Sequence, residues 1–194
     1  MLSLTPRQTR TACAAAVFFL GAWWVNRQAD AWLYAWADEG SGRPTLTGTW
    51  VGQMVTGGGQ PRALLLELHR WFPENDRSPC PRCPSIEGSA LVCDARGAVV
   101  PYSAGGDPGN RMATQMQVGV SPSVKPPPDG LELSVVRGAW AGDRLNLEAE
   151  FHWRRGTSAI SSTADPETNG WVPLIMRRGG EAEFRALCAR IRRP

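Results

Sequence analysis

The sequence predicts a mainly β domain of about eight antiparallel strands, with one helix at each end of the chain. Apolar and polar residues alternate repeatedly between residues 45 and 178, as they do in half-buried strands. Glycine and proline clusters separate these short segments, and the spacing becomes helical only near the C-terminus. Closely spaced strands with turn residues between them predict a barrel or a sandwich.

Residues 143–153 form the clearest predicted strand. Every second residue is apolar and the intervening ones are polar, so one face points to a core and the other to solvent. A helix would scatter the same residues around its circumference. The predicted inward face, which is also the candidate lining of a ligand site, comprises Leu145, Leu147, Ala149, Phe151 and Trp153.

Seven further segments have the same character with weaker alternation. Glycines 57–59 and residues 95–97 are the turns of two predicted hairpins. Residues 155–170 are polar and rich in turn residues, which favours a loop over a lid. The additional predicted strands are residues 46–55, 62–71, 86–94, 98–103, 114–120, 131–137 and 171–178.

The C-terminal residues 181–192 are predicted to form an amphipathic helix on the outside of the sheet. Phe184, Leu187, Cys188 and Ile191 recur at helical spacing. Acidic residues occupy the first turn and arginines the last, which suits the helix dipole.

The N-terminal segment has the charge pattern of a membrane helix. Residues 1–10 carry Arg7 and Arg10 and no acid, and residues 11–25 carry no charge at all. Basic residues before an apolar stretch predict that the N-terminus stays in the cytoplasm and that the rest of the chain lies outside. We therefore expect a single-pass protein of the cytoplasmic membrane whose C-terminal domain lies in the periplasm or outside the cell.

Two interpretations of this segment stay open, a retained anchor and a cleaved signal peptide. Fifteen helical residues span about 22 Å, less than a hydrocarbon core of about 30 Å. Small residues at 29–31 or 35–37 could form a cleavage site. Aromatic residues at the outer end suit a lipid headgroup zone and favour the anchor; these are Trp23, Trp24, Trp32, Tyr34 and Trp36. The expected organisation is residues 1–37 as a cytoplasmic stub, a membrane anchor or signal segment and an interfacial stretch, 38–44 as a linker, and 45–194 as the extracytoplasmic β domain with its C-terminal helix.

Four cysteines follow the apolar segment, and an even number outside the cytoplasm favours two disulfides. Cys93 shares a strand face with Glu87 and Ser89, so that face is predicted to be the outer one. Because Cys188 lies on the helix expected outside the sheet, the preferred pair is Cys93 with Cys188.

Cys80 and Cys83 form a Cys-x-x-Cys motif in a proline-rich segment. A redox centre would place the first cysteine at a helix N-terminus, yet Pro84 follows the second one and the surrounding segments alternate as strands. A zinc site would need another pair of ligands with comparable spacing. A structural disulfide is therefore favoured over a thiol–disulfide role, and a metal is not expected.

No recognisable catalytic motif is present in the sequence. His69 and His152 are the only histidines, and each lies in a predicted strand. The chain has neither a Gly-x-Ser-x-Gly elbow nor a His-Glu-x-x-His pair. A net charge of +3 with scattered arginines does not predict nucleic-acid binding. We expect no enzymatic activity and no cofactor.

Gly48-Thr49-Trp50 on the first predicted strand, together with Arg177 or Arg178 at the end of the last, resembles the pattern of the calycin superfamily of lipocalin-like barrels. The resemblance implies an eight-stranded barrel with an outer helix over residues 45–194. It also implies that Trp50 plugs one end of the barrel and that Arg177 or Arg178 caps it through a cation–π contact.

The function expected from these features is non-enzymatic binding at the cell envelope. A membrane-tethered barrel would take up an apolar small molecule in its interior or contact an envelope partner protein. The alternatives are a structural or assembly subunit of an envelope membrane complex, and a thiol–disulfide protein that uses Cys80 and Cys83.

Overall fold

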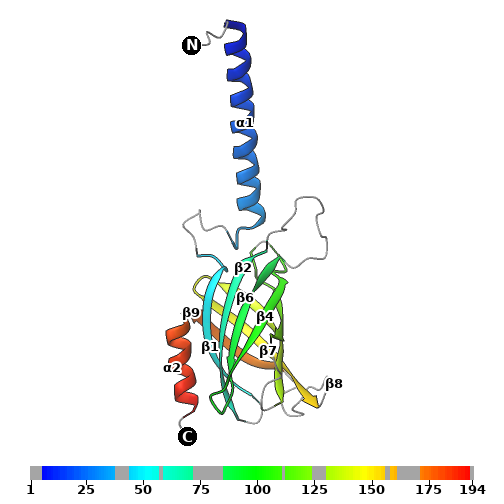
Figure 1. The fold of residues 1–194 in the computed structure, drawn as a ribbon, viewed down its shortest axis with the longest axis vertical. Coiled ribbons are helices and arrows are strands. Elements are labelled where there is room, and N and C mark those ends of the chain that lie inside the picture. The colour runs from blue at the N-terminus through cyan, green and yellow to red at the C-terminus, as the bar shows by residue number, and fades with distance from the viewer. Residues whose placement is uncertain are drawn as a thin grey trace.

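The structure is a β-barrel with a long helix projecting from one end and a short helix lying along its side (Figure 1). The computed structural model describes residues 6–37, 44–56, 59–71, 85–110, 112–123, 130–155, 158–160 and 171–192. The side chains of residues 6–12, 153–155 and 158–160 lie outside this description. Cys80 and Cys83 also lie outside the described residues.

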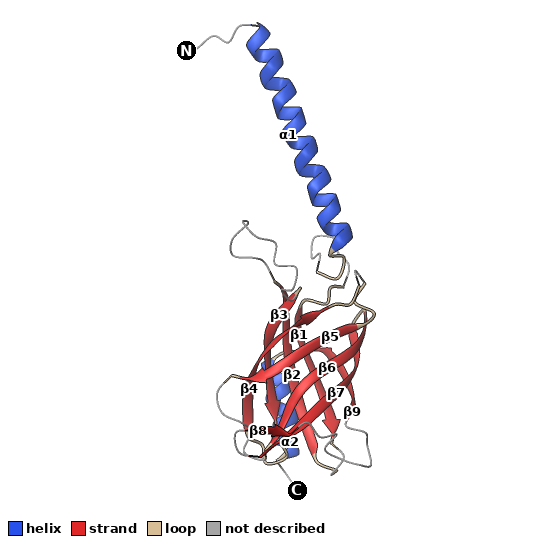
Figure 2. Cartoon of the chain, turned by 90° about the vertical axis from the view of Figure 1, so that its right-hand side faces the viewer, coloured by secondary structure: helices blue, strands red, loops and turns tan. Residues whose placement is uncertain are grey.

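The described strands form one antiparallel sheet that closes on itself (Figure 2). Eight strands make the barrel, in the order β1-β2-β3-β4-β5-β6-β7-β9, and the pairing of β9 with β1 joins the last strand to the first. The prediction of about eight antiparallel strands is confirmed, and the barrel is the correct choice over the sandwich. The strands are β1 Gly48–Val55, β2 Pro61–Arg70, β3 Ile86–Cys93, β4 Val99–Asp107, β5 Met116–Pro122, β6 Leu131–Ala141, β7 Arg144–Arg155, β8 Ser158–Ile160 and β9 Trp171–Arg178.

Three features of the strands differ from the expectation. The short strand β8 pairs with the end of β7 inside a segment predicted to be a loop. Strands β4 and β6 also continue through glycines that resemble turn residues in the sequence. At Gly138 a Cβ atom would lie 2.2 Å from the Asn146 carbonyl oxygen, and at Gly106 it would lie 2.1 Å from that of Gln117. Each of these glycines therefore lies where the backbone of the neighbouring strand approaches closely, a common reason for glycine within a strand.

The barrel interior is a single cluster of buried apolar side chains to which all eight barrel strands contribute. Leu145, Leu147, Ala149 and Phe151 belong to it and are at most 4% exposed. Trp153 pairs with Leu131 through the backbone, and its side chain is not among those described. The alternation of β7 therefore identified an inward face correctly over residues 145–151.

The C-terminal helix α2 (Glu181–Ile191) lies on the outer face of β1, β2 and β3. Its buried Phe184 packs in a second apolar cluster with Val51, Ala63 and Leu65. The disulfide Cys93–Cys188 joins α2 to the end of β3, with the two Cα atoms 5.8 Å apart. The predicted helix and the predicted cysteine pair are both confirmed.

The N-terminal helix α1 (Pro6–Leu33) extends away from the barrel and is followed by a turn at residues 34–37. We call residues 6–37 the stalk. Apolar side chains on successive positions from Val17 to Leu20 are 65–71% exposed, so they are distributed around the helix. No helix among the described residues combines the length and the apolar character needed to cross a membrane.

Candidate functional site

Trp50 and Arg178 lie against each other at the end of the barrel nearest the stalk, which we call the stalk end. Trp50 is fully buried on β1, and its indole Nε1 donates a hydrogen bond of 2.8 Å to the carbonyl oxygen of Leu46. The guanidinium carbon of Arg178 lies 3.9 Å from the centre of the Trp50 ring. This distance is within the range of a cation–π contact.

Arg178 also forms hydrogen bonds with the segment that precedes β1. Its guanidinium donates hydrogen bonds to the carbonyl oxygens of Thr45 and Thr47, the latter at 2.5 Å. Gly48 makes room for this side chain, because a Cβ atom there would lie 2.5 Å from Nη1 of Arg178. Burial lowers the pKa of Arg178 from its ordinary value, although an arginine stays protonated in a protein.

Arg177, the other candidate cap, faces the opposite side of β9. It is 69% exposed, and its guanidinium pairs with Glu183 on α2. Successive residues of a strand point to opposite faces of the sheet, so only one of the two arginines can reach Trp50. The structure brings Arg178 to Trp50 and leaves Arg177 outside the barrel.

The stalk contributes Trp36 to the same end of the barrel. Trp36 is 1% exposed and belongs to the interior cluster with Leu46 and Trp50. Its carbonyl oxygen accepts a hydrogen bond of 2.6 Å from the backbone N–H of Leu46. Trp36 therefore lies in the barrel core, whereas its sequence context indicated the lipid headgroup zone.

Arg70, the last residue of β2, joins the stalk to the barrel. Its guanidinium donates two hydrogen bonds to the carboxylate of Asp30, at 3.0 and 3.1 Å. The guanidinium carbon also lies 3.5 Å from the centre of the Tyr34 ring. Asp30 and Tyr34 are four residues apart and so share one face of a helical turn. The sequence signal that could have located this junction was an aspartate in an otherwise apolar, aromatic segment.

An arginine also lies inside the opposite end of the barrel, which we call the distal end. Arg62 is 1% exposed and lies directly across from the inward-facing Met54, so it shares the inward face. Its guanidinium carbon lies 5.5 Å from the centre of the Phe151 ring, and Phe151 comes from a strand that is not a neighbour of β2. Sequence reasoning missed Arg62, because its position before an apolar run resembles a strand end exposed to solvent.

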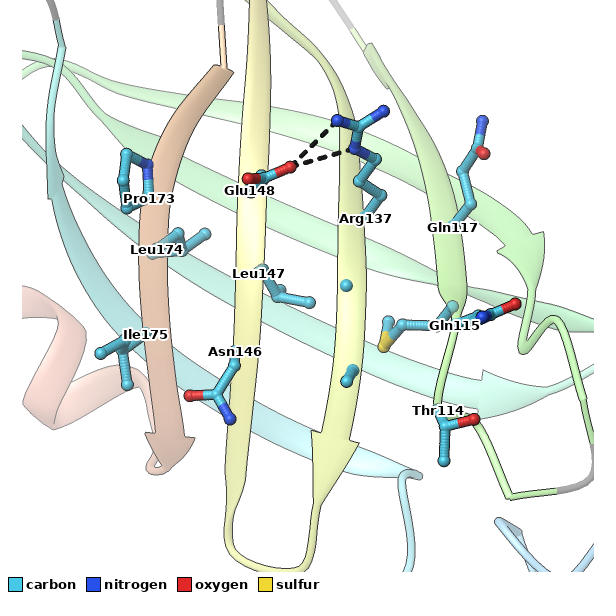
Figure 3. Close-up of a pocket in the computed structure, with 13 residues that line it drawn as sticks. Thr114, Gln115, Gln117, Arg137, Asn146, Leu147, Glu148, Pro173, Leu174 and Ile175 are labelled. Carbon is cyan, nitrogen blue, oxygen red and sulfur yellow. Dashed lines mark hydrogen bonds and ion pairs between the residues drawn. The ribbon is translucent and has the colours of Figure 1, made fainter.

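A shallow trough runs over the outer face of the barrel on β5, β6, β7 and β9 (Figure 3). It encloses about 650 Å³. Gln115 and Gln117 lie at the β5 side, Asn146 lies on β7, and the exposed apolar residues Pro173 and Ile175 lie on β9. We call this the outer trough; its outward-facing residues are Thr114, Gln115, Gln117, Arg137, Ala139, Asn146, Glu148, Pro173 and Ile175.

One ion pair crosses the outer trough. Arg137 on β6 donates hydrogen bonds of 3.0 and 3.2 Å to a carboxylate oxygen of Glu148 on β7 (Figure 3). The guanidinium carbon of Arg137 lies 3.6 Å from the centre of the Trp171 ring on β9. Three strands are therefore linked by side chains on the outer surface, in addition to their backbone pairing.

The two histidines lie on the outer face of the barrel. His69 is 55% exposed and its Nε2 lies 3.2 Å from Glu67 Oε1, while Nε2 of His152 lies 3.6 Å from Glu150 Oε2. Among the residues that the structure describes, no group of three or more His, Cys, Asp and Glu side chains could hold a metal ion.

Comparisons with known proteins found no matching family model, no matching curated protein and no matching solved structure.

Proposed function

We propose that this protein is a non-enzymatic, membrane-tethered binding module of the cell envelope, with a calycin-like barrel that binds an extended segment of a partner protein in the outer trough. The observation that carries this proposal is the lining of the outer trough, which combines exposed amides with an exposed apolar side chain. Helix α2 covers the other side of the barrel and leaves this face open.

The amide side chains suit the backbone of an extended peptide. Gln115, Gln117 and Asn146 are all exposed, and each offers one acceptor and two donor hydrogens. A peptide in extended conformation presents alternating N–H and C=O groups, which such amides can satisfy from both sides. Ile175 is 65% exposed and can bury an apolar side chain of the same peptide.

The outer trough can be tested with a photo-crosslinking amino acid placed at single positions of the full-length chain in its host cells. We expect an adduct from position 175, and we expect Asn146→Ala with Gln117→Ala to reduce its yield at least several-fold. Arg185 on α2 is 75% exposed and provides the matched control position. Equal adduct yields from positions 175 and 185 would contradict the proposal.

The membrane tether is the second part of the proposal and is supported by the exposed apolar surface of α1. Residues 13–25 of α1 are apolar all round, and such a helical stretch must be buried in protein or lipid. The side chains of Phe18, Phe19, Trp23 and Trp24 are 58–71% exposed in the chain by itself. Insertion of this surface into the cytoplasmic membrane, with the N-terminus inside, would remove it from water.

Alkaline extraction and protease protection test the tether. The full-length chain should stay with the membrane at high pH, and replacement of Phe18, Phe19 and Leu20 by serine should release it. Protease added outside the cytoplasm should degrade the barrel and leave an N-terminal tag protected. Extraction of the unaltered chain by alkali would rule out the tether.

A second candidate is the uptake of an apolar small molecule by the barrel interior. It is favoured by the apolar inward face, which includes Leu145, Leu147, Ala149 and Phe151. A barrel of eight strands is wide enough to be filled by side chains or to hold one small ligand. Native mass spectrometry of the purified protein should show a co-purified apolar molecule that Ala149→Phe displaces. A single species at the mass of the chain would rule out a bound molecule in the barrel interior and leave the outer trough as the candidate binding site.

A further inference from the structure

We infer that the N-terminal segment is a permanent part of the folded barrel and is not removed at residues 29–31 or 35–37, because the stalk supplies the side chain that closes the stalk end. This inference rests on the tether part of the proposed function, which requires that the segment is retained. It concerns the covalent fate of the chain and holds whether or not a ligand binds.

Trp36 is the first element of this closure. An indole occupies more core volume than any other side chain, and Trp36 is 1% exposed among residues of the barrel interior. Its backbone is held as well, since Leu46 donates a hydrogen bond to its carbonyl oxygen. A flexible tether between an anchor and a finished domain would need neither contact.

Arg70 on β2 is the second element of the closure, and it contacts the stalk from the barrel. The charged hydrogen bonds to Asp30 and the contact with the Tyr34 ring come from one guanidinium. The side chain of Arg70 is 21% exposed, so this contact is partly shielded from water. The contact fixes the last turn of α1 at the point where the chain turns toward Trp36.

The two candidate cleavage positions would damage this closure to different extents. Cleavage after Ala31 would remove Asp30 and leave Trp36 on the barrel. Cleavage after Ala37 would remove Asp30, Tyr34 and Trp36 together and open the stalk end above Trp50. Because either cleavage would remove contacts that hold the stalk end closed, we expect the export machinery to leave the segment uncleaved.

The first test is the intact mass of the full-length protein purified from its host membranes or soluble fraction. We expect a mass that includes residues 1–37 in whichever fraction the protein occurs. A mature chain that begins at residue 32 or 38 would overturn the inference. A full-length mass in the soluble fraction would contradict the tether and support this inference, whereas a shortened chain would overturn both, so the two failures are distinguishable.

The second test cuts the chain deliberately. A specific protease site inserted between residues 38 and 43 allows cleavage of the detergent-solubilised, folded protein. We expect the stalk to remain bound to the barrel, or to separate with a clear fall in the melting temperature of the barrel. Separation with an unchanged melting temperature would overturn the inference.

Two matched variants make the result specific to Trp36. Trp36→Ala should weaken retention of the cut stalk at least tenfold. Trp24→Ala removes an indole that is 58% exposed on α1 and should leave retention unchanged. Equal effects of the two substitutions would show that stalk retention reflects general apolar association and would overturn the role of Trp36.

Discussion

The two flanks of the barrel are built from the same kind of strand but have opposite outer surfaces. On the covered flank, the outward residues Val51, Ala63 and Leu65 are apolar and lie under α2. On the open flank, the outward residues of β5, β6 and β7 are mostly polar and form the outer trough with β9. The inward faces of both flanks belong to one core.

Under the proposed function, this difference divides the barrel into a flank that stabilises the fold and a flank that binds the partner. A strand with apolar residues on both faces must be covered on both faces, and α2 with its disulfide provides the second cover. The open flank needs no cover, so its outer side chains can change with little effect on folding. Substitutions on the covered flank should therefore reduce stability, and those on the open flank should mainly affect binding.

The largest expected effect on the covered flank comes from the disulfide. Replacing Cys93 and Cys188 together by serine opens a loop of 95 residues, and the chain-entropy model gives a loss of about 4–5 kcal/mol in the free energy of unfolding. Urea denaturation of the full-length chain in detergent measures this loss. A change below about 1 kcal/mol would contradict a stabilising role for this disulfide.

Phe184→Ala should have the next largest effect, because this ring is 1% exposed between α2 and the sheet. Truncation of a buried phenylalanine costs about 3–5 kcal/mol, and at the edge of a barrel we expect about 3 kcal/mol. Arg185→Ala, on the exposed side of the same helix, is the control and should change stability by no more than about 0.5 kcal/mol. Equal losses would mean that α2 does not bury Phe184 in solution.

Gly138→Ala is a substitution on the open flank that we expect to reduce stability, unlike most substitutions there. Gly138 has a φ of 149° and lies too close to Asn146 for a Cβ atom, so alanine should destabilise the protein by about 1–3 kcal/mol. Gly119→Ala on the neighbouring strand is the control, since its Cβ would meet only the Gly105 carbonyl oxygen, at 3.6 Å. Similar melting temperatures for the two variants would refute the close approach of β6 and β7.

The smallest expected effect is that of the Arg137–Glu148 ion pair. Both side chains are about half exposed, at 48% and 52%, so solvent screens their attraction. A double-mutant cycle with Arg137→Ala and Glu148→Ala should give a coupling energy of about 0.2–1 kcal/mol that falls at high salt. A coupling well above this range would place the open flank among the stabilising parts of the molecule.

Much of the local structure could be predicted because it depends on residues that are close in sequence. The alternation from Leu145 to Phe151 identified an inward face, and the helical spacing of Phe184 and Cys188 identified the buried side of α2. The cysteine pair followed from the same logic, since both cysteines were expected on outward surfaces. Gly106 and Gly138 were misleading, because each falls between two predicted strands and only the neighbouring strand shows that it permits close approach.

The residues of the candidate sites were harder to predict because their partners are distant in sequence. Arg70 lies 40 residues from Asp30, and Arg178 lies more than 130 residues from the Thr45 carbonyl that it contacts. The outer trough assembles side chains from four strands, and no single segment shows a pattern for it. A choice such as Arg178 over Arg177 depends on which face of the last strand points inward.

By itself, the sequence determined the elements: the strands, the amphipathic C-terminal helix, the apolar N-terminal segment and the faces that each must bury. These follow from periodicity and charge, which act over a few residues. Only the tertiary structure decided that the sheet closes, that Trp36 lies inside it and that the outer trough stays open. The physical reason is that closure brings distant strands into register, and a side chain is buried or exposed only after its neighbours are in place.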